Sequence, residues 1–190
     1  SEMCIRDRAY TSTIASPFTE IQSLKAVDLI LRHLPRAVET KSLDSLEQLS
    51  IASIAASMAF SNASLGAEHA LAHSLGGHFD MRHGAVHPIL LTAVMRFNLD
   101  YAETKLGDIG RVILDRSVGS PRETALAGID RLEEFFASFN VPLKLREEVD
   151  EGDKHYLEPI CRMAVNDACS LTNPRPASWQ EMLQICEEVW

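Results

Sequence analysis

Two segments of this chain begin with a serine followed directly by a proline, a strong signal for the start of an α-helix. Ser16–Pro17 and Ser120–Pro121 each precede a run whose apolar residues recur at helical spacing. Proline suits the first helical position because no backbone N–H is needed there, and serine is a preferred N-cap. Glu123 stands where a capping box requires it. We therefore expect capped helices to start at both pairs.

Helical periodicity continues through most of the chain, and no segment shows the strict alternation that predicts a β-strand. Breaks are expected at 61–66, at Gly76–Gly77, which would end a helix, and at the loop 171–177 with its two prolines. Segment 42–60 is rich in small residues and is expected to be buried nearly all round. The sequence predicts an all-α bundle of about seven helices, drawn from the periodic segments 16–34, 42–60, 67–75, 87–102, 102–116, 120–140, 155–170 and 178–190.

Composition limits the classes of protein to which the chain can belong. Its 190 residues suit a single domain, and a hydrophobic content of 46% argues against disorder. The formal net charge of −9 makes nucleic acid a poor partner. No apolar run reaches the roughly 18–20 residues that span a membrane, and no secretory signal is visible. Four scattered cysteines, at 4, 161, 169 and 186, fit reduced thiols in the cytoplasm.

The first eight residues, SEMCIRDR, differ in character from the rest of the chain. They carry no periodicity, no cap and no turn signal, and the pattern changes at Ala9. We interpret 1–8 as an added or spurious leader and exclude it from fold reasoning. Residues 9–190 are then expected to form one helical domain.

The segment 69–87, HALAHSLGGHFDMRHGAVH, holds five of the seven histidines. His69 and His73 are four residues apart, as are His83 and His87, so each pair shares one face of a helix. Two such pairs directed toward one place could bind a transition metal such as zinc or iron. A buried pair with only a packing role is the alternative for either pair alone. His78 is expected to be a solvated loop residue.

Four segments of the chain carry recognisable motifs: AYTSTIASPFTE at 9–20, SNASLGAEHALAHSLGG at 61–77, HGAVHPILLTAVMRFN at 83–98 and NDACSLTNPR at 166–175. Together they resemble the iron-containing alcohol dehydrogenase family, and the first is similar to the start of the family's helical half. The resemblance implies the C-terminal, all-helical domain of a two-domain enzyme. The N-terminal α/β domain, which binds NAD(P), would be missing here. The GDIG of 107–110 is too short for a dinucleotide-binding loop and lies in a helical pattern.

The family resemblance also implies roles for individual residues. His69 and His83 match metal ligands, with Fe2+ as the first candidate ion and Zn2+ as the second. His73 matches a catalytic histidine that relays a proton. Phe60 and Cys169 match positions near the substrate. By register, the family's ligand aspartate and first ligand histidine fall at Ser1 and Ile5, which cannot replace them.

The function implied is hydride transfer between a primary or secondary alcohol, or the corresponding aldehyde or ketone, and NAD or NADP. The chain as given is expected to be inactive alone, and the intact protein to be a homo-oligomer. A histidine at position 87 is similar to the maleylacetate reductase branch of the family, which stays open as an alternative. Two other hypotheses are a non-catalytic metal-binding module built from His69, His73, His83 and His87, and a structural domain that packs on a partner subunit.

Overall fold

The computed structural model describes residues 9–190. Seven α-helices lie wholly within this part of the chain, and no β-strand occurs in it, so the predicted all-α fold is confirmed. The helices are α2 (Pro17–Thr40), α3 (Leu43–Ala63), α4 (Ala67–Phe79), α5 (His83–Leu114), α6 (Pro121–Ala137), α7 (Leu157–Ala164) and α8 (Trp179–Glu188). Short 3-10 turns cover η1 (Leu145–Glu147), η2 (Glu151–Tyr156) and η3 (Ala168–Thr172). The leader 1–8 lies outside the described residues.

Both serine–proline pairs start helices, as predicted. Ser16 caps α2 and Ser120 caps α6, each in a complete capping box with proline in the first turn. The partner of Ser120 is Glu123, as expected from the sequence. A third capping box joins Ser178 and Glu181 at the start of α8. Local side-chain chemistry therefore fixes where these helices begin.

Of two predicted helix boundaries, the one at Gly76–Gly77 is wrong and the one at residue 102 is confirmed. Helix α4 continues through Gly76 and Gly77 to Phe79, and the chain turns at Asp80, whose φ is 52°. The division predicted at residue 102 is confirmed, because α5 consists of two helical segments that meet at a kink at Ala102, where the backbone leaves helical geometry (φ −132°, ψ 29°). Glycine within a helix costs about 1 kcal/mol relative to alanine, a penalty that packing overrides here. The fully buried Leu75 shows that this part of α4 faces the core.

Helix α3 is not buried all round. Its small residues, among them Ala52, Ala56 and Ala59, are buried, and α3 packs along α2. Its other face leaves Leu43 and Ile54 exposed, with 83% and 61% of their surface accessible. Small residues allow two helices to approach closely, but they cover only the one face that meets α2.

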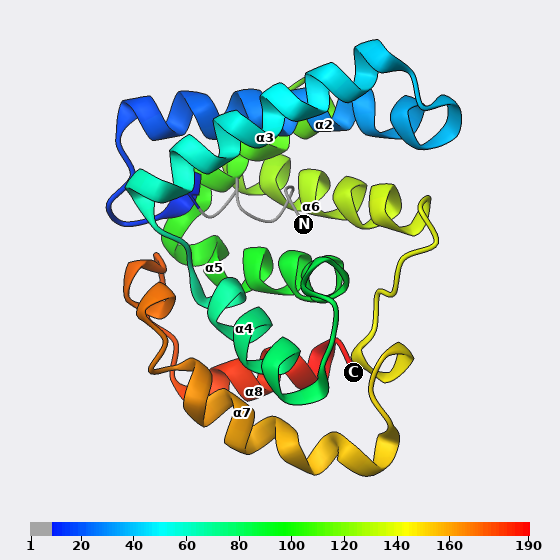
Figure 1. Cartoon of the computed structure of the whole chain (residues 1–190). Coiled ribbons are helices and arrows are strands. Elements are labelled where there is room, and N and C mark those ends of the chain that lie inside the picture. Colours follow the sequence, from blue (N-terminus) through cyan, green and yellow to red (C-terminus); the bar gives the residue numbers. More distant parts are fainter. Residues whose placement is uncertain (1–8) are drawn as a thin grey trace.

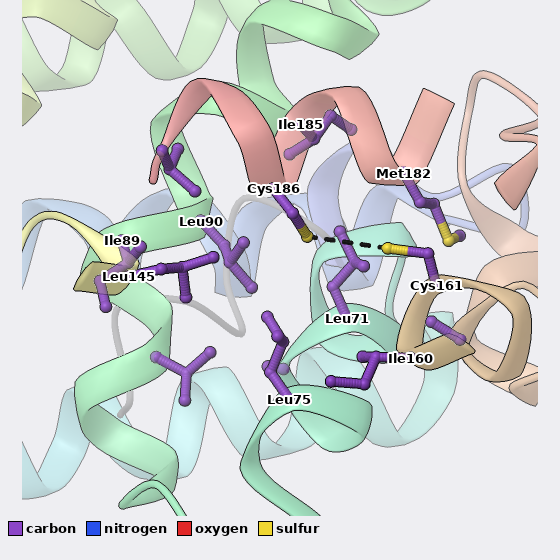
Figure 2. Close-up of a cluster of buried hydrophobic side chains, with 14 of the residues drawn as sticks. Leu71, Leu75, Ile89, Leu90, Leu145, Ile160, Cys161, Met182, Ile185 and Cys186 are labelled. Carbon is purple, nitrogen blue, oxygen red and sulfur yellow. Dashed lines mark hydrogen bonds between the residues drawn. The ribbon is translucent and has the colours of Figure 1, made fainter. Parts of the chain in front are cut away.

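The helices form two packed groups joined by the long helix α5 (Figure 1). At one end α2 and α3 run side by side as a helical hairpin, and at the other end α4, α7 and α8 pack together. The C-terminal half of α5 packs on α6, and their core includes Leu106, Ile109 and Ile129. The N-terminal half of α5 belongs to a second core with Leu71 of α4, Ile160 of α7 and Met182 of α8 (Figure 2).

Three glycines explain how closely α5 and α6 cross. A Cβ added to Gly110 would lie 2.3 Å from the Thr124 carbonyl oxygen, and one on Gly128 would lie 2.5 Å from the Cα of Gly110. Gly107 would meet the Pro121 oxygen at 2.8 Å. The glycines of GDIG therefore serve helix packing, which agrees with the rejection of this motif as a nucleotide loop.

Within residues 9–190, no single helix combines the length and apolar character needed to cross a membrane. The pair α3 and α4, which meet at a bend of 104°, satisfies both criteria only when taken together.

Candidate metal centre

Helices α4 and α5 bring four histidines into one cluster. His69 and His73 lie on α4, while His83 and His87 occupy the first two turns of α5. The ring centroids are 4.4 Å apart for His69–His73, 5.1 Å for His69–His83, 5.3 Å for His69–His87 and 4.3 Å for His83–His87. The two i, i+4 pairs therefore face each other across the α4–α5 turn, as their spacing predicted.

The cluster has a buried side and an open side. His87 is fully buried and His69 is 6% exposed. His83 and His73 are exposed. A group bound among these rings would thus contact α4 and α5 on its buried side and would remain reachable from solvent on the other side.

Glu68 and His87 form a buried pair beneath the cluster. His87 Nδ1 and Glu68 Oε1 are 2.9 Å apart, within hydrogen-bond distance, and neither side chain is exposed. On the other side of the same ring, His87 Nε2 lies 3.0 Å from His83 Nε2. The chain of contacts Glu68–His87–His83 thus runs from the interior to the surface.

A second contact anchors His73 on the open side. Its Nδ1 lies 3.1 Å from Asp167 Oδ2, which comes from the segment between α7 and η3. Burial raises the pKa of Asp167, but hydrogen bonds from the Cys169 amide and from His73 outweigh it, so the pKa falls below its usual range. Asp167 therefore stays ionised at neutral pH and can orient the imidazole of His73.

The donor atoms suit a divalent transition metal. One potential ligand atom each from His69, His83 and His87 lies within 4.8 Å of the others. A second such group combines His73, Asp167 and Cys169. Imidazole nitrogen is a good ligand for zinc, iron and cobalt, whereas calcium and magnesium prefer oxygen. The residues present therefore fit a metal of the first kind.

Comparison with known proteins shows the family to which the chain belongs. The family model described as "Fe-containing alcohol dehydrogenase family, C-terminal" matches residues 8–190. The chain belongs to this family. Its all-helical structure is accordingly that of the family's C-terminal domain.

Curated relatives in the iron-containing alcohol dehydrogenase family are alcohol dehydrogenases of several kinds. The 1,3-propanediol dehydrogenase of Klebsiella pneumoniae is 37% identical over 188 residues, covering 96% of this chain and 47% of that protein. The NADPH-dependent butanol dehydrogenase of Clostridium saccharobutylicum is 32% identical, with the same two coverages of 96% and 47%. The chain therefore spans about half the length of the curated relatives it matches.

Solved structures of this family agree with the fold. A 1,3-propanediol oxidoreductase superposes with a TM-score of 0.94 at 32% identity, over 100% of this chain and 50% of that chain. A maleylacetate reductase from Agrobacterium tumefaciens reaches 0.79 at 17% identity, over 100% of this chain and 50% of that chain. That second likeness concerns the fold alone.

The structure brings only some of the remaining predicted residues to the histidine cluster. Cys169 lies with His73 and Asp167, so the structure brings it to the cluster. Phe60 is half-buried in the last turn of α3 and packs against a small cluster with Ala9, Ala59 and Ala63. His78 is exposed as expected, but it lies in α4 rather than in a loop. Ser1 and Ile5 lie outside the described residues.

Sequence reasoning missed Glu68 and Asp167. Glu68 directly precedes His69 and Asp167 lies two residues before Cys169, so both stand inside the family motifs. Their carboxylates reach His87 and His73 across 19 and 94 positions of sequence. The position of Glu68 beside His69 was the signal for that residue, whereas for both carboxylates the histidine partner could not be read from local spacing.

Two motifs of this family also meet in a structural contact. Asn98 ends MRFN and Asn173 lies in TNPR, and both side chains are buried. Asn173 Oδ1 accepts from the Ala67 amide at 3.1 Å, which fixes the start of α4. This contact holds the helix that carries His69 and His73 in its position relative to α5.

Proposed function

We propose that this chain is the metal-binding, helical half of an NAD(P)-dependent alcohol dehydrogenase that acts on small alcohols and aldehydes. The observation that carries the proposal is the convergence of His69 and His83 on α4 and α5. The names of the Klebsiella and Clostridium relatives support an alcohol substrate, and that of the second supports a nicotinamide cofactor. In the reaction, the alcohol carbon gives a hydride to NAD(P)+ and the hydroxyl gives a proton to the protein.

His69 and His83 are the proposed ligands of a divalent metal, with Fe2+ as the first candidate and Zn2+ as the second. A bound divalent ion supplies Lewis acidity, which favours loss of the proton from an alcohol. The role of the two histidines is to fix the ion between α4 and α5. The exposure of His83 leaves the approach to the site open on one side.

His73 is proposed to take the alcohol proton. Asp167 stays ionised and accepts from His73 Nδ1, so His73 Nε2 carries the lone pair that can receive a proton. The exposed side of the ring can pass the proton to water. Asp167 acts as the positioning residue in this step, because it contacts His73 and not the substrate.

Cys169 is proposed to line the substrate side of the site, since it lies with His73 and Asp167. Phe60 is also proposed as a substrate contact, on the resemblance to the family. Its packing in the structure is with the alanines of the α3 end, which accounts for its burial without a substrate.

A chimera tests the proposal. Residues 9–190 would replace the matching half of the Klebsiella 1,3-propanediol dehydrogenase, and NAD(P)H formation from an alcohol would be measured. We expect turnover by the chimera and none by the 190-residue chain. His73→Asn should lower kcat by roughly 100- to 10,000-fold, the usual contribution of general acid–base catalysis. A chimera that folds and binds metal yet shows no alcohol-dependent turnover would refute the proposal.

A closed four-histidine centre is a second candidate function, because the ring of His73 also lies 5.8 Å from that of His83. It would bind a metal without turnover. The exposure of His73 and its contact with Asp167 argue against a ligand role. Metal titration of a His73 variant separates the two candidates.

A further inference from the structure

We infer that His87 is a third nitrogen ligand of the metal centre and that Glu68 holds it in place. The centre in this chain would then consist of three imidazoles, from His69, His83 and His87. The inference rests on the proposed function, because it adds a ligand to the metal site proposed there. It concerns side chains that α4 and α5 carry.

The first step concerns which nitrogen of His87 carries a proton. Glu68 Oε1 lies 2.9 Å from His87 Nδ1. An ionised Glu68 accepts a hydrogen bond from His87 Nδ1, and this arrangement leaves the lone pair on Nε2. That tautomer is the one needed for metal binding through Nε2. Histidine ligands almost always donate their other N–H to a carboxylate, a carbonyl or water in this way.

The second step concerns the spacing of the two nitrogens. His87 Nε2 and His83 Nε2 are 3.0 Å apart. Two nitrogens bonded to one zinc ion at about 2.0–2.1 Å in a tetrahedral site are about 3.3 Å apart. The observed separation is close to this value, so a small outward movement of the exposed His83 ring would admit an ion between them.

The third step concerns His69, which supplies the remaining nitrogen. Its ring stacks on that of His87 with centroids 5.3 Å apart and 17° between planes. It stands edge-on to His83 at 5.1 Å. Candidate ligand atoms of all three residues lie within 4.8 Å of one another. One ion can therefore reach all three rings from their common side.

Burial fixes the orientation of His87 within this arrangement. Glu68 and His87 are both completely buried, and burying polar groups costs free energy that each must recover through hydrogen bonds. The two ring nitrogens of His87 contact Glu68 and His83, so both find polar partners. The Nε2 of His87 lies on the side of the exposed His83, where a metal ion could take the place of the contact between the two nitrogens. Three protein nitrogens with an open fourth position are the pattern of catalytic zinc sites.

Metal titration of the 190-residue chain tests the inference without any measurement of activity. Zn2+ and Co2+ binding would be measured by calorimetry, with Co2+ absorption as a second readout of the ligand set. We expect His87→Asn to weaken binding about 100-fold or more, and Glu68→Gln to weaken it about 10- to 100-fold, as for other outer-shell partners. His73→Asn should leave affinity unchanged, and His78→Asn, on the exposed face of α4, is the matched control.

The possible outcomes separate the inference from the proposed function. If His69→Asn and His83→Asn abolish binding while His87→Asn leaves it intact, the inference fails and the proposed two-histidine site stands. If His73→Asn weakens binding as much as His87→Asn, the centre has four histidine ligands and the three-histidine inference is overturned. If the wild-type chain binds neither ion, both the inference and the proposed metal role fail.

A measurement on the wild-type chain covers the case in which a His87 variant does not fold. Nitrogen NMR of histidine-labelled protein distinguishes protonated, lone-pair and metal-bound ring nitrogens. Added Zn2+ should shift one ring nitrogen in each of three histidines, and Nδ1 of His87 should stay protonated. A shift confined to the other rings, with His87 Nε2 unmoved, would contradict the inference.

Discussion

Asn98 and Asn173 hydrogen-bond to each other in both directions. Asn98 Nδ2 donates to Asn173 Oδ1 at 3.2 Å, and Asn173 Nδ2 donates to Asn98 Oδ1 at 2.8 Å. Both side chains are 5% exposed. Asn173 also accepts from the Ala67 amide and donates to the Arg175 carbonyl, so the pair joins α5, the start of α4 and the loop after η3.

Replacing either asparagine should destabilise the fold, because buried polar groups would lose their hydrogen-bond partner. We expect Asn98→Ala and Asn173→Ala each to lower the free energy of unfolding by about 1–3 kcal/mol. The decrease should be larger for Asn173→Ala, because the Ala67 amide also loses its hydrogen-bond acceptor. Urea unfolding followed by circular dichroism measures this. Exposed Asn62→Ala is the control. Strictly additive effects in the double variant would contradict a direct coupling of the pair.

Two glycine replacements, one at the crossing of α5 and α6 and one on α4, are expected to have opposite effects on stability. Gly110→Ala would place a Cβ 2.3 Å from the Thr124 carbonyl oxygen and should destabilise by about 1–3 kcal/mol through overpacking. A Cβ on Gly77 in α4 would meet nothing within 4 Å, so Gly77→Ala should stabilise by roughly 0.5–1 kcal/mol. Thermal unfolding of both variants checks the prediction. Equal effects of the same sign would refute it.

The lowered pKa of Glu181 should account for part of the loss of stability in acid. Hydrogen bonds from the amide and hydroxyl of Ser178 hold its pKa below the ordinary value of 4.5, with a further contribution from Arg175. The unfolded chain therefore binds a proton at higher pH than the folded chain does. The stabilisation is present above about pH 4.5 and is lost as the pH falls through the lowered pKa.

Glu181→Gln should therefore flatten the dependence of stability on pH in this range. Urea unfolding at pH 7 and at about pH 4 would give the free energies of unfolding for both proteins. The variant should lose less stability on acidification than the wild type. Glu148→Gln, which changes an exposed carboxyl elsewhere, should retain the wild-type slope. An unchanged slope in Glu181→Gln would be inconsistent with the role of the capping box.

The three cysteines of the described residues should differ in reactivity toward a thiol reagent. Cys161 and Cys186 are fully buried between α7 and α8 with sulfurs 3.8 Å apart (Figure 2), while Cys169 is half-buried. The hydrogen bond with Cys161, together with burial, raises the pKa of the Cys186 thiol. Thiolate is the reactive form, so this pair should react only on unfolding.

Reaction with Ellman's reagent in native buffer and in urea measures the difference. Cys4 lies outside the described residues and is replaced by serine throughout, so that it does not contribute to the signal. We expect one fast thiol in native buffer, absent in Cys169→Ser, and two more in urea. Fast modification of Cys161 or Cys186 in the native chain would mean that the α7–α8 core opens readily.

Local sequence was sufficient to predict the helical class, most helix starts and the clustering of four histidines. Ser16, Ser120 and Pro121 act through contacts within one turn, so their effect can be read from neighbouring residues. Histidines four residues apart share a helix face whatever surrounds them, which is why the two pairs could be placed correctly. The family motifs fall in the same category, since they are read from the order of residues alone.

The ends of the helices and the contacts of each histidine depend instead on tertiary packing. Helix α4 passes through two glycines because packing of Leu75 outweighs their low helix propensity. Glu68 and Asp167 reach His87 and His73 only once α4 is set against α5 and the segment before η3. These contacts join residues from different elements, so their geometry depends on how the helices pack and not on any local spacing.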